Sequence, residues 1–299
     1  MIALVHLVWG PLGPELPQRF LDSYRRHSAE IEHELVILFN GVDTEARRSF
    51  EPLLADTPHE TVTLERPVQD LEAYIQAAQR LSHKRLCFMN SYSEILADGW
   101  LAKLSAALDR PDVGMAGATG SWTSIFSMLL NALRLPNPYR RTLPSRAEVR
   151  RQMYAIESQL GREREGELPG RAAPVGSAPL SFKLASIAKT LRLLPEQLLL
   201  FEPFPAQHLR TNAFIVEREL FASLRTRPMR RKMDAWVMES GRESFTRQVQ
   251  RRGLHTLVVD RDGLTYDQEQ WPLSRTFWQL NQEGLLVADN QTRAYQLGS

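Results

Sequence analysis

An apolar segment that ends abruptly in polar residues sets the strongest limit on how this chain can fold. Leu86 to Met89 are apolar without interruption, and Asn90, Ser91 and Tyr92 follow directly. A strand that is apolar on both faces is typical of a parallel sheet covered by helices on both sides. Ligands of such sheets collect beyond the carboxyl ends of the strands. The segment therefore favours an α/β fold with a site after Met89.

A simpler interpretation of the same segment is a strand followed by a helix cap. The hydroxyl of Ser91 or Ser93 would then cap a helix that carries Trp100 and Leu104 on its apolar face. The order of the neighbouring elements decides which interpretation is better supported.

Strands and helices alternate along the first part of the chain. Apolar runs predict strands, and apolar residues at helical spacing predict helices between them. The expected strands are 2–9, 34–39, 61–64, 85–90 and 113–117, and the expected helices are 15–27 and 69–81. Short connections in this order imply right-handed crossovers and a parallel sheet. Further strands are expected over 204–216 and 254–260.

Composition narrows the class of protein. The chain has 299 residues, 43% of them hydrophobic, which is enough to build a core. Its formal net charge of +2 gives no support for a nucleic-acid partner. Cys87 is the single cysteine, so an internal disulfide is excluded and a reducing compartment fits. With neither a secretory signal pattern nor an apolar run of about 20 residues, we expect a cytoplasmic protein.

A second polar turn follows the second expected strand. It reads Asn40-Gly41-Val42-Asp43 and lies at the same edge of the predicted sheet as Asn90. Two such turns at one edge are the arrangement of a nucleotide site. The alternative is a plain turn, since Asn and Gly both tolerate positive φ.

With these motifs in this order, the chain resembles glycosyltransferases of the GT-A fold, in particular the family 2-like group that uses nucleotide-activated sugars. In that family the first strand and an Asn-Gly-Ser-x-Asp turn hold the nucleoside; the matching places here are Val5 to Gly10, with Val8 among them, and Asn40, Gly41 and Asp43. The resemblance covers the chain up to about Gly120 and again after Phe204. It implies a Rossmann-type three-layer sandwich with a mostly parallel central sheet, in one domain over residues 1–299.

The family's metal motif is altered in this sequence. The fourth strand of the family normally ends in Asp-x-Asp, which ligates a divalent ion on the sugar diphosphate, whereas this chain has Asn90-Ser91-Tyr92. Mg²⁺ and Mn²⁺ prefer carboxylate oxygens, so the change argues against a divalent metal cofactor and leaves no predicted metal ligand. The resemblance still places Asn90, Ser91 and Tyr92 at the donor diphosphate. Cations or backbone N–H groups would then stabilise the leaving group.

Three further polar or aromatic positions are candidate ligands. Arg210 and Asn212 lie on the approach to the strand that ends near Val216, and a guanidinium offers phosphate a bidentate fork. The alternative for Arg210 is an ion pair. Trp122 follows a glycine-rich stretch and is a candidate to stack on an acceptor sugar, or else a core residue. Asp289, after an apolar run in the tail, is a second candidate for the acceptor site.

The resemblance also implies a general base. In the family, an acidic residue at the start of a late helix removes the proton of the acceptor hydroxyl, and Glu239 matches that place, with Asp234 as the reserve. The alternative for Glu239 is an acid that stabilises a helix N-terminus through the dipole.

Residues 124–203 read as a helical and linker insertion over the active-site edge. Ile125 to Leu133 predict a short apolar helix, and 181–194 predict a basic amphipathic one. Such a helix can lie on a membrane surface, which suits a lipid-linked acceptor at the inner face of a membrane. The alternative is a lid or an extra helical layer.

The sequence therefore predicts a hexosyltransferase-like enzyme of polysaccharide or glycoconjugate synthesis. It would move a sugar from a nucleotide-diphosphate donor to a hydroxyl of a glycan or lipid-linked acceptor, by inversion and without a metal. The alternative is a catalytically silent protein that binds nucleotide sugars or glycans on the same fold. Nucleic acid is not an expected partner.

Overall fold

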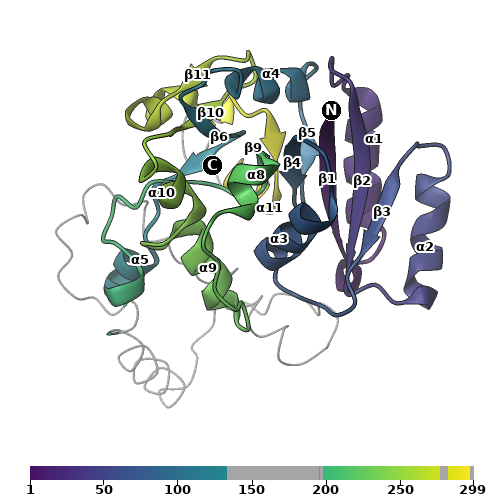
Figure 1. Ribbon diagram of the computed structural model, residues 1–299, viewed down its shortest axis with the longest axis horizontal. Helices are drawn as coiled ribbons and strands as arrows, with labels where there is room; N and C mark the ends of the chain where they lie inside the picture. Colours follow the sequence, from purple (N-terminus) through teal and green to yellow (C-terminus); the bar gives the residue numbers. More distant parts are fainter. Residues whose placement is uncertain (133–194, 196–197, 277–281, 297–299) are drawn as a thin grey trace. The chain divides into compact units, whose positions relative to one another are not determined.

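The computed structural model describes residues 1–132, 195, 198–276 and 282–296 (Figure 1). The chain divides into one unit formed by residues 1–121 and 207–299, and a second formed by residues 122–206. The expected insertion, residues 124–203, falls within the second unit. The expected basic helix over 181–194 lies outside the described residues, and the assignment of all 299 residues to one domain stays a prediction.

An eight-stranded sheet forms the centre of the first unit. Its order is β11-β10-β6-β9-β4-β1-β2-β3. All neighbours from β3 to β4 pair in parallel, as do β6 and β10, whereas β9 and β11 run antiparallel to their neighbours. The strands are β1 (Ile2–Trp9), β2 (His33–Asn40), β3 (Glu60–Thr63), β4 (Arg85–Met89), β6 (Val113–Gly117), β9 (Ala213–Glu217), β10 (His255–Val259) and β11 (Thr265–Tyr266). The predicted mostly parallel sheet is confirmed.

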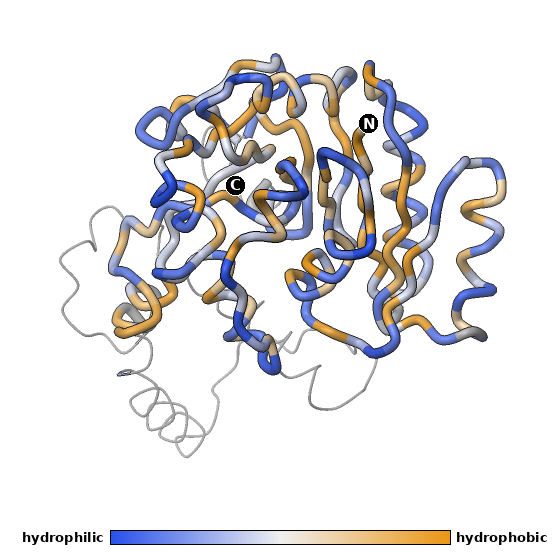
Figure 2. Tube along the Cα trace, in the orientation of Figure 1, coloured by the Kyte–Doolittle hydropathy of each residue, from blue (hydrophilic) through white to orange (hydrophobic). Residues whose placement is uncertain are grey.

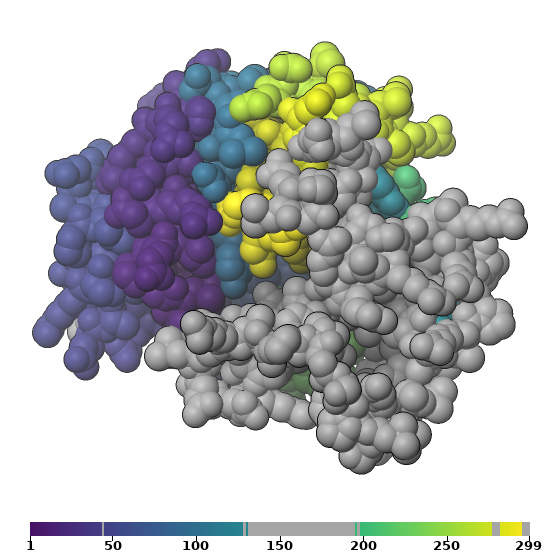
Figure 3. All heavy atoms as spheres, turned by 180° about the vertical axis from the view of Figure 1, so that it is seen from behind, coloured from purple at the N-terminus to yellow at the C-terminus, as the bar shows by residue number. Residues whose placement is uncertain are grey.

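Helices cover both faces of this sheet, which confirms the predicted three layers. One face packs against α1 (Glu15–Arg26), α2 (Thr44–Leu54) and α4 (Trp100–Ala107). The other packs against α3 (Asp70–Arg80), α8 (Arg218–Ala222), α9 (Lys232–Ser240) and α10 (Phe245–Gln250). Helix α2 is an addition to the predicted order, and space-filling atoms show α1 and α2 side by side on the outer surface of their face (Figure 3).

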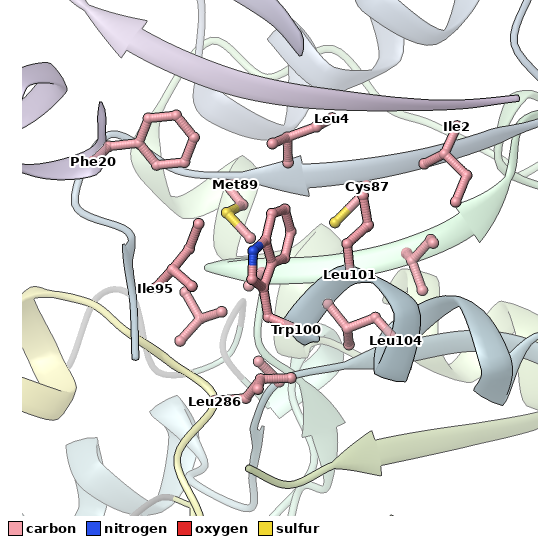
Figure 4. Packing of buried hydrophobic residues seen from close by; sticks show 14 of the residues in the cluster. Ile2, Leu4, Phe20, Cys87, Met89, Ile95, Trp100, Leu101, Leu104 and Leu286 are labelled. Atoms are coloured by element: carbon pink, nitrogen blue, oxygen red, sulfur yellow. The ribbon is translucent and has the colours of Figure 1, made fainter. Parts of the chain in front are cut away.

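Successive side chains of a strand point to opposite faces of the sheet, so each strand contributes to two cores. In β1, Leu4 and Val8 face the first core, and Val5 and Leu7 face the second. Figure 4 shows the first core, in which Trp100 and Leu101 of α4 meet Cys87 and Met89 of β4, among others. The central strands are accordingly the most hydrophobic parts of the trace (Figure 2). Burial on both faces is what the uninterrupted apolar runs predict.

Two predicted boundaries are wrong. The helix after β4 begins at Trp100, with Gly99 in a left-handed conformation before it (φ 66°), so neither Ser91 nor Ser93 caps it. The expected continuous strand over 204–216 is broken into β8 (His208–Leu209) and β9. Strand β8 pairs with β7 (Gly120–Ser121) and β9 pairs with β4, so Arg210 and Asn212 lie between two strands.

The C-terminal part returns to the segment after β4. After the 3-10 helix η2 (Gln268–Ser274), strand β12 (Val287–Ala288) pairs antiparallel with β5 (Glu94–Ile95), and α11 (Asn290–Gln296) follows. Figure 3 shows these C-terminal residues in yellow against the blue segment that follows β4. A tail far along the chain thereby reaches the edge where β4 ends.

The second unit contains α5 (Ile125–Ala132), which confirms the predicted short apolar helix. Ser124 precedes it, and its Oγ accepts a hydrogen bond from the N–H of Ser127 at 3.1 Å, as an N-cap does. Among the described residues of both units, no helix is long and apolar enough to cross a membrane.

Candidate active site

One edge of the sheet collects the loops that the sequence singles out. Strands β1, β2 and β4 end there at Trp9, Asn40 and Met89, and β9 begins there, because Ala213 pairs with Met89 in antiparallel register. The turns after Trp9 and Asn40, the loop from Asn90 and the segment before Ala213 therefore lie at the same edge. This is the edge at which α/β sheets bind ligands.

The first two turns pack directly against each other. A Cβ added to Gly10 would lie 2.2 Å from the carbonyl oxygen of Gly41, so only glycine fits at that position. Gly41 itself has φ 66° and lies under the ring of Trp9. Val8, a predicted donor contact, is buried in the core and supports this turn from below. The two glycines therefore allow the two turns to pack in close contact at this edge.

Asn40 and Asp43 build the second turn with their side chains. The Nδ2 of Asn40 donates to the Val68 carbonyl at 2.8 Å, and its Oδ1 accepts from the Val68 N–H at 3.0 Å. Asp43 is exposed and caps α2, because its Oδ1 accepts from the Ala46 N–H at 2.7 Å. Both polar atoms of the Asn40 amide thus make a hydrogen bond within the protein. Donor binding by either side chain stays a prediction.

The loop after β4 is held by its own polar groups. The Oδ1 of Asn90 accepts from the Tyr92 N–H at 2.9 Å and from the Ser93 hydroxyl at 3.1 Å. Ser91 is buried; its hydroxyl donates to the Leu7 carbonyl at 2.8 Å and accepts from the Trp9 N–H at 3.1 Å. Ser91 thereby ties β4 to β1. The Nδ2 of half-buried Asn90 makes no hydrogen bond within the described structure, which leaves one donor at the edge.

Arg293 is a neighbour of this loop that the sequence does not single out. Its Nη2 donates to the Tyr92 carbonyl at 2.9 Å, and its Nη1 donates to Glu94 at 2.9 Å. Burial lowers the pKa of Arg293, and the nearby carboxylate of Glu94 opposes this effect. Because Arg293 and Tyr92 are 201 positions apart, only the fold brings them together.

Arg210 and Asp289 pair with each other. The Nη1 and Nη2 of Arg210 approach the two carboxylate oxygens of Asp289 at 3.3 and 2.5 Å, and both side chains are buried. The ion pair that the sequence left as an alternative for Arg210 is therefore present. Asp289 also caps α11, accepting from the Thr292 N–H at 2.9 Å. Their predicted roles at the donor and the acceptor remain untested.

Asn212 contributes a buried polar atom without a partner. Its Nδ2 lies 3.5 Å from the Val287 carbonyl, whereas its Oδ1 makes no hydrogen bond with any described residue. Its backbone carbonyl accepts from the Asn90 N–H and from the Ser93 hydroxyl, which joins the segment before β9 to the loop after β4. An unpaired buried acceptor is costly unless water or a ligand satisfies it. Asn212 thus stays a candidate ligand.

Glu239 reaches this edge from the last turn of α9. Its Oε1 accepts from both the N–H and the hydroxyl of Thr211, at 3.1 and 2.7 Å. The expected place at the start of a late helix is wrong, because α9 runs from Lys232 to Ser240. The alternative of an acid at a helix N-terminus is wrong for the same reason. Thr211, which the sequence does not mark, positions this carboxylate beside the loops of the edge.

Asp234 occupies the helix-capping position instead. It lies in the first turn of α9, and its Oδ2 accepts from the Arg231 N–H at 2.9 Å. Its Oδ1 pairs with the guanidinium groups of Arg227 and Arg231 at 3.6 and 3.4 Å. These contacts give Asp234 a structural role at the start of the helix. Trp122, half-buried, begins the second unit, where its carbonyl accepts from the Ala206 N–H at 3.0 Å.

The donor atoms at the altered Asp-x-Asp position do not fit a divalent cation. The side-chain oxygens of Asn90 and Ser91 are already used in hydrogen bonds, and neither carries charge. Within the described residues, no group of three or more His, Cys, Asp or Glu side chains gathers in a metal-binding arrangement.

No protein-family model matches this sequence, and no curated protein matches it significantly. Solved structures with a similar fold include a mannosyltransferase from Pyrobaculum calidifontis in complex with GDP-Man and Mn²⁺, at 11% identity and a TM-score of 0.45, over 88% of this chain and 55% of that chain. A glucosyl-3-phosphoglycerate synthase from Mycobacterium tuberculosis, in complex with UDP and Mn²⁺, is 14% identical with a TM-score of 0.38, over 76% of this chain and 60% of that chain. The bifunctional glycosyltransferase WbbM is 12% identical with a TM-score of 0.36, over 75% of this chain and 33% of that chain. This chain thus spans little more than half the length of the mannosyltransferase, and likenesses of this degree do not assign an activity.

Proposed function

We propose that the chain is a glycosyltransferase that moves a sugar from a nucleotide-diphosphate donor to a hydroxyl of a glycan or lipid-linked acceptor. The observation that carries the proposal is the position of Glu239. Thr211 holds its carboxylate at the edge where β1, β2 and β4 end, which is where the motif resemblance expects a base. The N–H and hydroxyl of Thr211 fix this carboxylate through its Oε1, so its Oε2 is available to accept a proton.

In the proposed reaction, Glu239 takes the proton of the acceptor hydroxyl. The acceptor oxygen attacks the anomeric carbon as the bond from that carbon to the diphosphate oxygen breaks, so the nucleoside diphosphate leaves with the bonding electrons. Attack from the face opposite the leaving group inverts the anomeric centre. Gly10 and Gly41 support the proposal by allowing the two turns that would hold the nucleoside to pack directly on each other.

We include metal independence in this proposal. The uncharged and already bonded oxygens of Asn90 and Ser91 support it, because they offer a cation nothing to bind. The Nδ2 of Asn90 is an available donor for a diphosphate oxygen, and such donors stabilise developing negative charge. Turnover should therefore persist in EDTA.

Two variants of α9 test the base. Glu239→Gln keeps the shape of the side chain, and we expect kcat to fall by roughly 10²- to 10⁴-fold with unchanged donor binding and melting temperature. Asp234→Asn weakens the cap of the same helix, and we expect a lower melting temperature with kcat largely retained. Turnover by Glu239→Gln at the parent rate would refute the assignment.

One observation favours the alternative, a silent protein that binds nucleotide sugars or glycans. The pairing of Arg210 with Asp289 occupies the guanidinium that would otherwise face the diphosphate. A thermal-shift screen against nucleoside diphosphates tests binding alone, because selective binding raises the melting temperature by mass action. Binding without turnover across a broad panel of donors and acceptors would establish the alternative.

A further inference from the structure

The loop between α8 and α9 carries five basic side chains in eight residues. It reads Arg225-Thr-Arg227-Pro-Met-Arg230-Arg231-Lys232. The loop is anchored, since Met229 is buried in the second core and Gln248 bonds both the N–H and the carbonyl of Arg225, at 2.7 and 3.0 Å. These contacts with the second core and with Gln248 hold the backbone of the loop in place. The residues of the loop are strongly hydrophilic (Figure 2).

Within the described residues, two carboxylates pair with the side chains of this basic loop. Asp234 is shared by Arg227 and Arg231, and Asp70 lies 3.6 Å from Lys232. Arg225 and Arg230 are exposed, and neither forms an ion pair within the described structure. Gathering cations on a fixed backbone is electrostatically unfavourable unless an anion joins them.

The basic loop lies beside the candidate active site. Lys232 is the first residue of α9, and its partner Asp70 is the first residue of α3. Glu239 lies seven residues further along α9, which at a rise of about 1.5 Å per residue places it about 10 Å from Lys232 along the helix axis. One short helix therefore joins the basic loop to the proposed base.

We propose that the basic loop, Arg225 to Lys232, binds a phosphate or diphosphate group of the acceptor while the acceptor hydroxyl lies at Glu239. This inference rests on the function proposed above and narrows its acceptor to a phosphorylated one. Guanidinium groups bind phosphate oxygens bidentately, and several of them fix its orientation.

Two sources can supply such a group: a soluble phosphorylated sugar, or the headgroup of a lipid-linked sugar at an anionic bilayer. Binding to inorganic pyrophosphate tests the shared chemistry, and it is measured with the donor site saturated by the nucleoside diphosphate that gives the largest thermal shift. Vesicles of phosphatidylcholine, alone or mixed with phosphatidylglycerol, separate the sources. Binding only to the mixed vesicles identifies the lipid source, whereas binding to pyrophosphate but to neither vesicle identifies the soluble one.

The test compares two double variants with equal changes in net charge. Arg225→Glu/Arg230→Glu alters the basic loop, and Arg26→Glu/Arg48→Glu alters exposed arginines of α1 and α2. We expect the loop variant to lose at least about tenfold in pyrophosphate affinity, with the donor-induced thermal shift unchanged, and the control to match the parent. Equal pyrophosphate affinity of the two variants overturns the loop assignment alone. Absence of any donor-induced shift in the parent protein refutes the proposed function and, with it, the acceptor assignment.

Discussion

The guanidinium of Arg210 and the carboxylate of Asp289 form a two-pronged ion pair in the interior of the protein. The side chain of Arg210 is 7% exposed and that of Asp289 is not exposed at all. Asp289 follows β12 and caps α11, so the pair joins the C-terminal segment to the start of β9. A buried pair of this kind is stable only while both charges are present.

We therefore expect Asp289→Ala to lower the free energy of unfolding by about 3–5 kcal/mol, because it removes the carboxylate that pairs with the buried Arg210 charge. Urea denaturation followed by circular dichroism measures the change. Glu283→Ala removes the partner of Arg275 in an exposed ion pair and should cost less than about 1 kcal/mol. Equal losses in the two variants would contradict the importance of the buried pair.

The central sheet could be predicted because its strands are buried on both faces. Uninterrupted apolar runs such as Leu86 to Met89 have few other stable environments in a globular chain, and polar residues mark where each run ends. Helix α2 was not predicted, because its only strong local signal is the cap at Asp43. That residue also matches a ligand position of the resembled family.

The partners within the site could not be predicted in the same way. Arg210 and Asp289 are 79 positions apart, and Thr211 and Glu239 are 28 apart, so their contacts depend on which strands and helices become neighbours. The placement of Glu239 within α9 depends on where the helix starts. The carboxylate of Asp234, which accepts from the Arg231 N–H, favours a start at Lys232, and this leaves Glu239 in the last turn.

The contact between the first two turns leads to a prediction about donor binding. Gly10→Ala places a Cβ 2.2 Å from the Gly41 carbonyl oxygen, and we expect a loss of about 1–3 kcal/mol in stability together with a smaller thermal shift from nucleotides. Gly253→Ala is the control, because Gly253 has φ 78° with nothing within 4 Å of an added Cβ. The control should lose stability through backbone strain and keep the full nucleotide shift. If Gly10→Ala kept the full nucleotide-induced thermal shift, these turns would have no part in donor binding.

The buried phenol of Tyr74 leads to a prediction of a substitution that does not lower stability. In the part of the chain that the structure describes, its hydroxyl has no hydrogen-bond partner. Burial, followed by the charges of Asp70 and Glu239, raises the pKa of Tyr74. Because the ring packs on Phe88 at 4.6 Å between centroids, Tyr74→Phe should keep the packing and hold or raise stability by up to about 1 kcal/mol.

Tyr24→Phe is the matched control, since that hydroxyl bonds the Nε2 of His33 at 2.9 Å. It should cost about 1 kcal/mol. Thermal unfolding measured by calorimetry distinguishes the two variants. A loss in Tyr74→Phe as large as that in Tyr24→Phe would show that the Tyr74 hydroxyl has a partner, such as a buried water.

The imidazole of His6 should make stability depend on pH. Its ring is fully buried in β1 and stacks on Phe20 at 3.7 Å between centroids, and neither ring nitrogen has a hydrogen-bond partner among the described residues. Burial lowers the pKa of His6 to about 3 in the folded protein, whereas an unfolded histidine titrates near 6.5. Between these values the unfolded chain binds a proton that the folded chain does not.

The free energy of unfolding should therefore fall as pH decreases below 6.5, by about 1.4 kcal/mol per pH unit from His6 alone, and this contribution should level off near pH 3. His6→Phe removes the titrating group while keeping an aromatic ring against Phe20, so its stability should fall less steeply over the same range. His59→Gln, at a half-exposed position, should retain the steepness of the parent. Urea denaturation at a series of pH values gives the three slopes, and identical slopes for the parent and His6→Phe would mean that His6 is protonated in the folded protein.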